Sequence, residues 1–292
     1  MTVKTAKCHF CSECNGYGCP GELPGMGGIR NNINFQLNCA DWNIYPRNVS
    51  DDDLYKCKKP VVRLAPITGS VENIGFETEE PYYQQIINAC VEAGIELSIG
   101  DGCPDEKIKY GIAALKNAGK KGAVFIKPYA NEKILERIEW AKDVAEIAGI
   151  DIDSYNIVTM RNLVKLEQKT AAQIKELRQK SQKPFAIKGV FTGADIELVK
   201  DVKPEIVVIS NHGGRVENRT GSTIDFFAEH AKELKNYAGE IWIDGGIRKE
   251  RDLYVASYFG ASQIMIARPL ISALCKGGKK EVCRFVKETL KI

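Results

Sequence analysis

Residues 184–210 read PFAIKGVFTGADIELVKDVKPEIVVIS, two short apolar runs separated by an amphipathic stretch. The runs Phe185–Gly189 and Ile206–Ser210 have the length and composition of buried strands. Between them, apolar residues recur at helical spacing over residues 194–201. This pattern predicts a strand, a crossover helix and a second strand parallel to the first.

The same alternation runs from Pro60 to the C-terminus. Further strands are expected at Val61–Pro66, Ile95–Ile99, Ala123–Lys127, Gly149–Asp153, Ile241–Asp244 and Gln263–Ala267. Helices are expected near residues 80–93, 104–118, 131–147, 163–181, 194–201, 224–237, 250–258 and 270–290. About eight such units predict an α/β fold of the (β/α)8 TIM-barrel type.

An open doubly wound sheet would give a similar alternation. Such a nucleotide-binding sheet would carry G-x-G-x-x-G after its first strand. Residues 64–69 read LAPITG at that place. The strand number and the missing motif therefore favour the barrel.

The composition indicates one large domain. Of 292 residues, 44% are hydrophobic and 27% are charged, enough for a single barrel core. Residues 60–292 are expected to form this barrel. Residues 1–59, rich in Cys and Gly, show no sustained periodicity and are expected to form an irregular cap.

Charge and hydropathy exclude two classes of partner. The net charge of +3 is small and no segment gathers Lys and Arg, so a nucleic-acid partner is not expected. Apolar runs such as Ile206–Ile209 are far shorter than the roughly 20 residues of a membrane span. The first residues, MTVKTAKCHF, lack the apolar stretch of a secretory signal, so we expect a cytoplasmic protein.

The sixth predicted strand ends in Ser210-Asn211-His212-Gly213-Gly214-Arg215. In a barrel, loops at the carboxyl ends of the strands converge on one mouth, where catalytic groups lie. A histidine accepts protons near neutral pH, and an arginine offers a planar fork to a carboxylate. A structural, hydrogen-bonded histidine is the alternative, which the neighbouring glycines and Arg215 disfavour.

The last two strands end in Asp244-Gly245-Gly246-Ile247-Arg248 and Ala267-Arg268-Pro269. Loops at these positions of barrels frequently bind phosphate through backbone N–H groups and arginines. A phosphorylated ligand is therefore predicted, although each loop alone could be an ordinary turn.

These three motifs resemble the signature of the FMN-dependent α-hydroxy-acid oxidase and dehydrogenase family, which includes glycolate and lactate oxidases. The resemblance is strongest from about residue 184 onward. It implies that His212 takes a proton from the substrate while the adjacent carbon delivers a hydride equivalent to flavin N5, and that Arg215 holds the substrate carboxylate. It implies FMN contacts for Lys188 at the N1 and O2 edge, and for Ser98, Ser210, Asp244, Gly245, Gly246, Arg248, Ala267 and Arg268.

Other positions match the family more loosely. Tyr129 corresponds to an active-site tyrosine, although Lys127-Pro128 replaces the usual glutamine context. Asp153 corresponds to the aspartate that hydrogen-bonds the histidine, with Asp151 as the alternative because alternate strand residues face the same way. The family's N-terminal tyrosine and its second arginine have no clear counterpart, and Arg161 is the nearest candidate for the latter.

Cys8, Cys11, Cys14 and Cys19 form the other non-random feature. Four closely spaced thiols suit an iron–sulfur cluster or a zinc ion, and Cys39 or Cys57 could serve as a remote ligand. Free thiols are the alternative. An iron–sulfur centre near FMN would direct electrons to a carrier protein.

The predicted function is thus FMN-dependent oxidation of a 2-hydroxy acid or related hydroxylated small molecule. One alternative is an FMN-dependent isomerase or reductase resembling the type 2 isopentenyl diphosphate isomerases. Another is a non-catalytic flavin-binding barrel. A homo-oligomer is expected.

Overall fold

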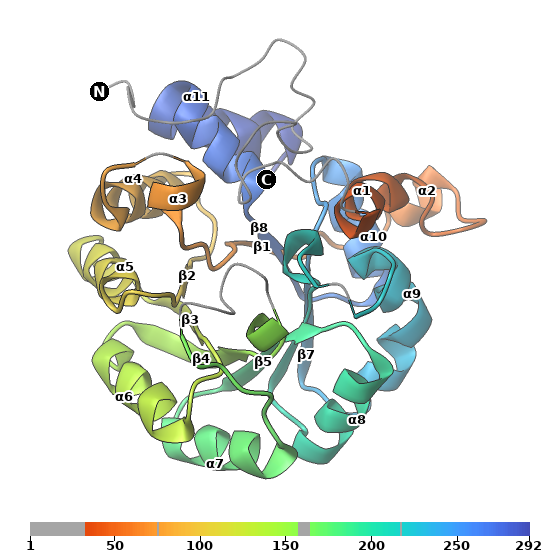
Figure 1. Cartoon of the computed structure of the whole chain (residues 1–292). Coiled ribbons are helices and arrows are strands. Elements are labelled where there is room, and N and C mark those ends of the chain that lie inside the picture. The colour runs from red at the N-terminus through yellow and green to blue at the C-terminus, as the bar shows by residue number, and fades with distance from the viewer. Residues whose placement is uncertain (1–32, 75, 157–163, 217) are drawn as a thin grey trace.

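The fold is a parallel eight-stranded barrel (Figure 1). The computed structural model describes residues 33–74, 76–156, 164–216 and 218–292. Over these ranges the strands are β1 (Val61–Leu64), β2 (Ser98–Gly100), β3 (Gly122–Ile126), β4 (Ala145–Asp151), β5 (Phe185–Val190), β6 (Ile206–Ile209), β7 (Glu240–Asp244) and β8 (Gln263–Ile266). Their order is β1-β8-β7-β6-β5-β4-β3-β2, and a parallel bridge between Arg63 and Glu96 joins the two ends. The predicted TIM barrel is confirmed.

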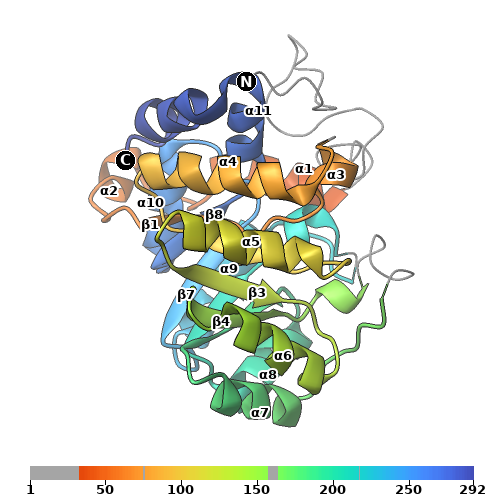
Figure 2. The ribbon, with the colours of Figure 1, turned by 90° about the vertical axis from the view of Figure 1, so that its left-hand side faces the viewer.

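Helices surround the strands, as Figures 1 and 2 show. After each strand of the barrel comes one of α4 (Glu79–Glu92), α5 (Glu106–Asn117), α6 (Asn131–Ala141), α7 (Ala171–Ser181), α8 (Gly193–Val202), α9 (Thr223–Leu234), α10 (Glu250–Phe259) and α11 (Arg268–Arg284). Thr170 and Thr192 begin α7 and α8 with capping boxes, which satisfy the first free N–H groups. A short helix, α3 (Ser70–Asn73), precedes α4.

Several predicted boundaries are wrong. The helix expected over 131–147 ends at Ala141, because β4 already begins at Ala145. The alanines and the glutamate of residues 145–148 favour a helix locally, but this segment forms β4 because it pairs with β3 and β5. The helix expected from 163 begins only at Ala171, and β2 begins at Ser98 rather than at Ile95.

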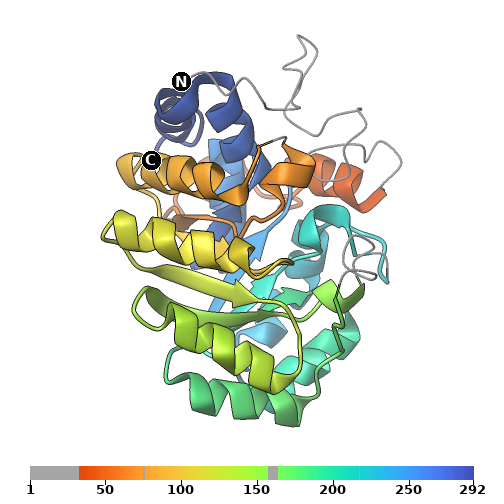
Figure 3. The ribbon, with the colours of Figure 1, turned by 60° about the vertical axis from the view of Figure 1, so that its left-hand side comes forward.

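The expectation that the segment before Pro60 is wholly irregular is also wrong. Residues 33–59 contain α1 (Ile33–Ala40), the turn η1 (Asp41–Asn43) and α2 (Asp51–Leu54). Figures 1 and 2 place α2 beside α10, and Figure 3 shows α1 next to the loop that follows β6. The division into a cap of residues 1–59 and a barrel of residues 60–292 stays a prediction.

The barrel interior is filled by side chains that alternate along the strands. This inner cluster contains Ala65, Ala123, Phe125, Ala186, Ile206, Val208, Trp242 and Met265. A larger cluster fills the space between strands and helices. Because alternate residues face the axis, the next inward positions toward the carboxyl ends are polar, and they form the site below. Among the described residues, no helix is long and apolar enough to cross a membrane.

Candidate functional site

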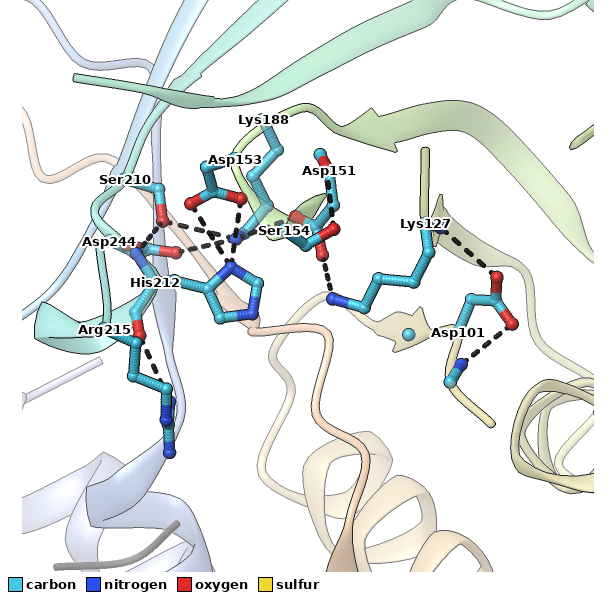
Figure 4. A network of polar contacts seen from close by, with 12 residues as sticks. Asp101, Lys127, Asp151, Asp153, Ser154, Lys188, Ser210, His212, Arg215 and Asp244 are labelled. Carbon is cyan, nitrogen blue, oxygen red and sulfur yellow. Dashed lines mark hydrogen bonds and ion pairs between the residues drawn. The ribbon is translucent and has the colours of Figure 1, made fainter. Parts of the chain in front are cut away.

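Five neighbouring strands end in buried polar side chains that continue the inward-facing positions of the barrel (Figure 4). We call them the polar row; its members, on β3 to β7, are Lys127, Asp151, Lys188, Ser210 and Asp244. Lys127 lies two residues beyond Phe125, and Asp244 two beyond Trp242, so the strand alternation turns both toward the mouth.

Asp151 holds two ammonium groups together. Its Oδ2 lies 2.8 Å from Lys127 Nζ, and its Oδ1 lies 3.1 Å from Lys188 Nζ. Lys188 also donates to Ser210 Oγ at 3.2 Å and lies 3.6 Å from Asp244 Oδ2. Each charged side chain of the row therefore lies next to a group of opposite charge.

Burial disfavours ionisation of the Asp151 carboxyl, but the charges of Lys127 and Lys188 outweigh burial and hold its pKa well below the ordinary value. Burial likewise opposes the charge of Lys188, yet Asp151 and Asp244 raise the pKa of Lys188. For Asp244, burial prevails over Lys188, so its pKa is raised. Asp151 and Lys188 thus stay charged in spite of their burial.

His212 contacts Asp153 as the resemblance implies. Its Nδ1 lies 3.1 Å from Asp153 Oδ1, and its backbone N–H donates to Ser210 Oγ at 3.2 Å. Burial lowers the pKa of His212; Asp153 opposes this effect, while Lys127 and Lys188 add to it. A neutral imidazole that donates Nδ1–H to Asp153 leaves Nε2 as a base.

The backbone around this pair is unusual. His212 has φ 55°, a left-handed conformation that few side chains adopt and that often marks functional sites. Gly189, with φ 100°, directly follows Lys188, and a Cβ there would lie 2.5 Å from Asp153 Cγ. Only glycine therefore lets β5 pass so close to the Asp153 carboxylate.

Three guanidinium groups gather near the ends of β6, β7 and β8. Arg215 donates to the His212 carbonyl at 3.1 Å, and Arg268 to the Gly213 carbonyl at 3.1 Å. Burial, followed by the like charges of Arg215 and Arg248, holds the pKa of Arg268 well below its ordinary value. A bound phosphate would relieve this repulsion, so the cluster has the chemistry of an anion site.

Helix α1 supplies contacts that the sequence did not predict. Asn38 and Asn211 exchange hydrogen bonds through their amides at 2.8 and 3.1 Å, and Asn38 Oδ1 also accepts from Thr223 N. Asn34, one helical turn earlier, accepts from Gly221 N at 2.8 Å. The spacing of the two asparagines, four residues apart, was the available signal.

Helix α1 and the turn η1 that follows it lie against the predicted phosphate loops. The Phe35 ring is 4.3 Å from the Arg268 guanidinium, and Trp42 Nε1 donates to the Gly245 carbonyl at 2.9 Å. A Cβ on Gly246 would stand 1.7 Å from the Asn38 carbonyl oxygen. Only glycine at position 246 therefore lets α1 approach this loop. The sequence predicted a ligand contact for Gly246 but not this packing role.

Tyr129, Ser98 and Ala267 complete the set of predicted site residues. The Tyr129 ring packs against Lys133 and Arg137 of α6 at 4.4 and 4.5 Å, and its buried hydroxyl has no hydrogen-bond partner in the described part of the chain. The buried Ser98 hydroxyl likewise lacks a partner there. Ala267 immediately precedes α11, so it lies beside Arg268.

The predicted metal ligands Cys8, Cys11, Cys14 and Cys19 lie outside the described residues, as does Arg161. Cys39 and Cys57 are described and are not in disulfides, and Cys39 Sγ is 4.0 Å from Arg248 Nη2. Asp151, Asp153 and His212 bring potential ligand atoms within 4.8 Å of one another. Because two lysines already neutralise Asp151, we assign no metal there.

Comparisons with known proteins find a matching family model, curated relatives and similar solved structures. Residues 116–291 match the family model described as FMN-dependent dehydrogenase. The 2-hydroxyacid oxidase 2 of Mus musculus is 36% identical over 117 residues, covering 39% of this chain and 33% of the relative. An L-lactate oxidase of Nostoc sp. is 31% identical over 110 residues, covering 38% of this chain and 30% of the relative.

The matched part thus spans about a third of these curated relatives. Among solved structures, mandelate oxidase with benzoyl-formic acid superposes with a TM-score of 0.67 at 19% identity, covering 89% of this chain and 83% of the other. At this identity the likeness supports the barrel fold alone.

Proposed function

Because this chain belongs to the FMN-dependent dehydrogenase family, we propose that it oxidises a 2-hydroxy acid or a related hydroxylated small molecule with bound FMN. The observation that carries the proposal is the contact of 3.1 Å between His212 Nδ1 and Asp153. This contact would orient the imidazole as a base, and the Ser210 hydroxyl connects His212 with Lys188.

The imidazole acts as the base. Asp153 accepts the Nδ1–H, so Nε2 carries the lone pair that takes the proton of the substrate hydroxyl. Once protonated, the ring is stabilised by the Asp153 carboxylate. The lowered pKa of His212 keeps the free imidazole unprotonated at neutral pH.

Arg215 orients the substrate. Its guanidinium forms a planar fork suited to a carboxylate, and its hydrogen bond to the His212 carbonyl fixes it beside the base. A carboxylate held there would bring the neighbouring hydroxyl to the imidazole. Tyr129, whose hydroxyl is buried, is proposed as a further catalytic residue.

The residues present fit FMN at both ends. The clustered guanidinium groups suit a phosphate, and the Lys188 ammonium suits the polar edge of the flavin ring. The Ser98 hydroxyl, unpartnered within the described ranges, is a further candidate contact. When bound, FMN would accept two electrons from the substrate carbon, with N5 as the acceptor atom. The proposed contacts are Lys188, Ser98, Ser210, Asp244, Gly245, Gly246, Arg248, Ala267 and Arg268.

The N-terminal thiols are a second part of the proposal. We propose that Cys8, Cys11, Cys14 and Cys19 bind an iron–sulfur cluster or a zinc ion, and that an iron–sulfur cluster would pass electrons to a carrier protein. Iron and zinc analysis of anaerobically purified protein distinguishes the two. Absence of both metals would contradict this part of the proposal.

The function itself is tested by anaerobic purification, flavin quantification and mixing with a panel of 2-hydroxy acids. We expect one FMN per chain and loss of the flavin absorption on adding the substrate. Bound FMN that no hydroxy acid reduces, with turnover of an unsaturated or phosphorylated substrate, would favour an isomerase or reductase. A protein that neither contains nor takes up FMN would refute the proposal.

A further inference from the structure

We propose that Lys127 tunes the reduction potential of the bound flavin by neutralising Asp151, which leaves the charge of Lys188 available to the ring. The inference rests on the proposed function, since it requires a flavin at the polar row. It concerns a charged pair in a place where Lys127-Pro128 stands instead of the glutamine context that is usual in the family.

The pair is buried and close. The side chains of Lys127 and Asp151 are 7% and 5% exposed, and their charged atoms lie 2.8 Å apart. Lys188, 4% exposed, takes the other oxygen of the same carboxylate at 3.1 Å. Water screens such charges poorly, so each one acts strongly on its neighbours.

The arrangement also matches the flavin in hydrogen-bonding pattern. Along the rim, Lys188, Asp151 and Lys127 present a donor, an acceptor and a donor. The pyrimidine edge of an isoalloxazine presents a carbonyl, an N–H and a second carbonyl, the complementary pattern. A carboxylate can accept further bonds after pairing with both lysines, because each oxygen has two lone pairs.

The net charge of Lys127, Asp151 and Lys188 decides whether the reduction potential of the bound flavin is raised or lowered. Two electrons and one proton, supplied by the substrate or by a chemical reductant, convert the ring into a reduced form with negative charge at this edge. If Asp151 were paired only with Lys188, its carboxylate would cancel the positive charge that Lys188 offers to the reduced ring. Because Lys127 supplies a second ammonium, the three side chains carry a net positive charge that favours the reduced ring.

A purely structural ion pair is the competing explanation, in which Lys127 merely compensates a buried carboxylate. The two explanations differ in the signs that they predict for the shifts in reduction potential. Tuning requires that removal of Lys127 and removal of the Asp151 charge shift the potential in opposite directions, whereas structural damage gives no reason for opposite signs.

The experiment measures the midpoint potential of FMN bound to the wild-type protein by anaerobic reduction against reference dyes. The variants are Lys127→Met, Lys127→Gln, Asp151→Asn and the double variant Lys127→Met with Asp151→Asn. Lys142→Met, an exposed lysine that follows α6, is the matched control. Lys127→Gln keeps a hydrogen-bond donor and serves if the methionine variant does not fold.

We expect both Lys127 variants to weaken binding of reduced relative to oxidised FMN by at least about tenfold, which lowers the potential by about 30 mV. Asp151→Asn should raise the potential, and the double variant should return it toward the wild-type value. The Lys142 control should not change it. If the variants bind FMN stably but their potentials are unchanged, or all shift with the same sign, this inference alone is overturned. If the wild-type protein fails to bind FMN, the proposed function is overturned as well.

Discussion

Gly189 and Asp153 approach so closely that a Cβ on residue 189 would lie 2.5 Å from the Asp153 carboxylate carbon. This approach links β5 to the base, because Asp153 is also the partner of His212. We predict that Gly189→Ala displaces Asp153 and lowers kcat by about 10²-fold, since small misplacements of catalytic groups are costly. Steady-state kinetics measures the effect.

Gly94→Ala is the control for this variant. Gly94 also has a positive φ, 73°, but no atom of the described residues lies within 4 Å of the place that a Cβ would take there. Gly94→Ala should therefore cost roughly 1–2 kcal/mol in unfolding free energy, and Gly189→Ala should cost more because of the added contact with Asp153, but only Gly189→Ala should lose activity. Equal kcat losses in the two variants would show that strain, rather than Asp153, is responsible.

Asp153→Asn should remove the charge that stabilises the protonated imidazole. We expect kcat to fall by about 10²- to 10⁴-fold, the usual contribution of general-base catalysis, while the absorption spectrum of bound FMN is retained. Rapid anaerobic mixing with substrate isolates this step. An Asp153→Asn protein that reduces its flavin at the wild-type rate would exclude this role of Asp153.

The pH dependence should report His212. Because burial and the two lysines lower its pKa, kcat/KM should rise with pH through a value below the ordinary pKa of histidine, about 6.5. Lys127→Met removes one opposing positive charge, so protonated His212 becomes easier to form and the rise should move to higher pH. A shift in the other direction would contradict the electrostatic description of the site.

The arginine cluster should discriminate between phosphorylated and unphosphorylated flavin. Arg268→Met is expected to weaken FMN binding by at least about tenfold and to leave riboflavin binding nearly unchanged, because only FMN carries the phosphate. Flavin fluorescence titration of the apoprotein measures both ligands. Arg284→Met, on the exposed end of α11, is the control. Parallel losses for both flavins would place the phosphate elsewhere.

Much of this architecture follows from local sequence. Short β-branched runs predicted the strands, and their polar ends singled out Ser210 and Asp244, whereas Lys188 was singled out by the family resemblance. The partnership of Lys127 with Asp151 needs the register between β3 and β4, where Ile126 pairs with Ile150. Residue patterns do not contain that register, so the charged pair could not be predicted.

Helix α1 escaped prediction for a different reason. Its sequence, INFQLNCA, includes asparagines, which favour turns over helix interiors. Here the Asn34 and Asn38 side chains bond instead to the loop after β6, so tertiary contacts hold the helix. Contacts between residues so far apart in the sequence are only weakly visible in the local sequence pattern.

The central claim is that the imidazole of His212 takes the proton of a hydroxy acid at a flavin site. The direct measurement compares wild-type protein with His212→Asn, both loaded with FMN, in single-turnover anaerobic mixing with a reducing 2-hydroxy acid. We predict rapid bleaching of the wild-type flavin and a rate at least about 10²-fold slower in the variant, with equal FMN content. Equal bleaching rates in the two proteins would contradict the account.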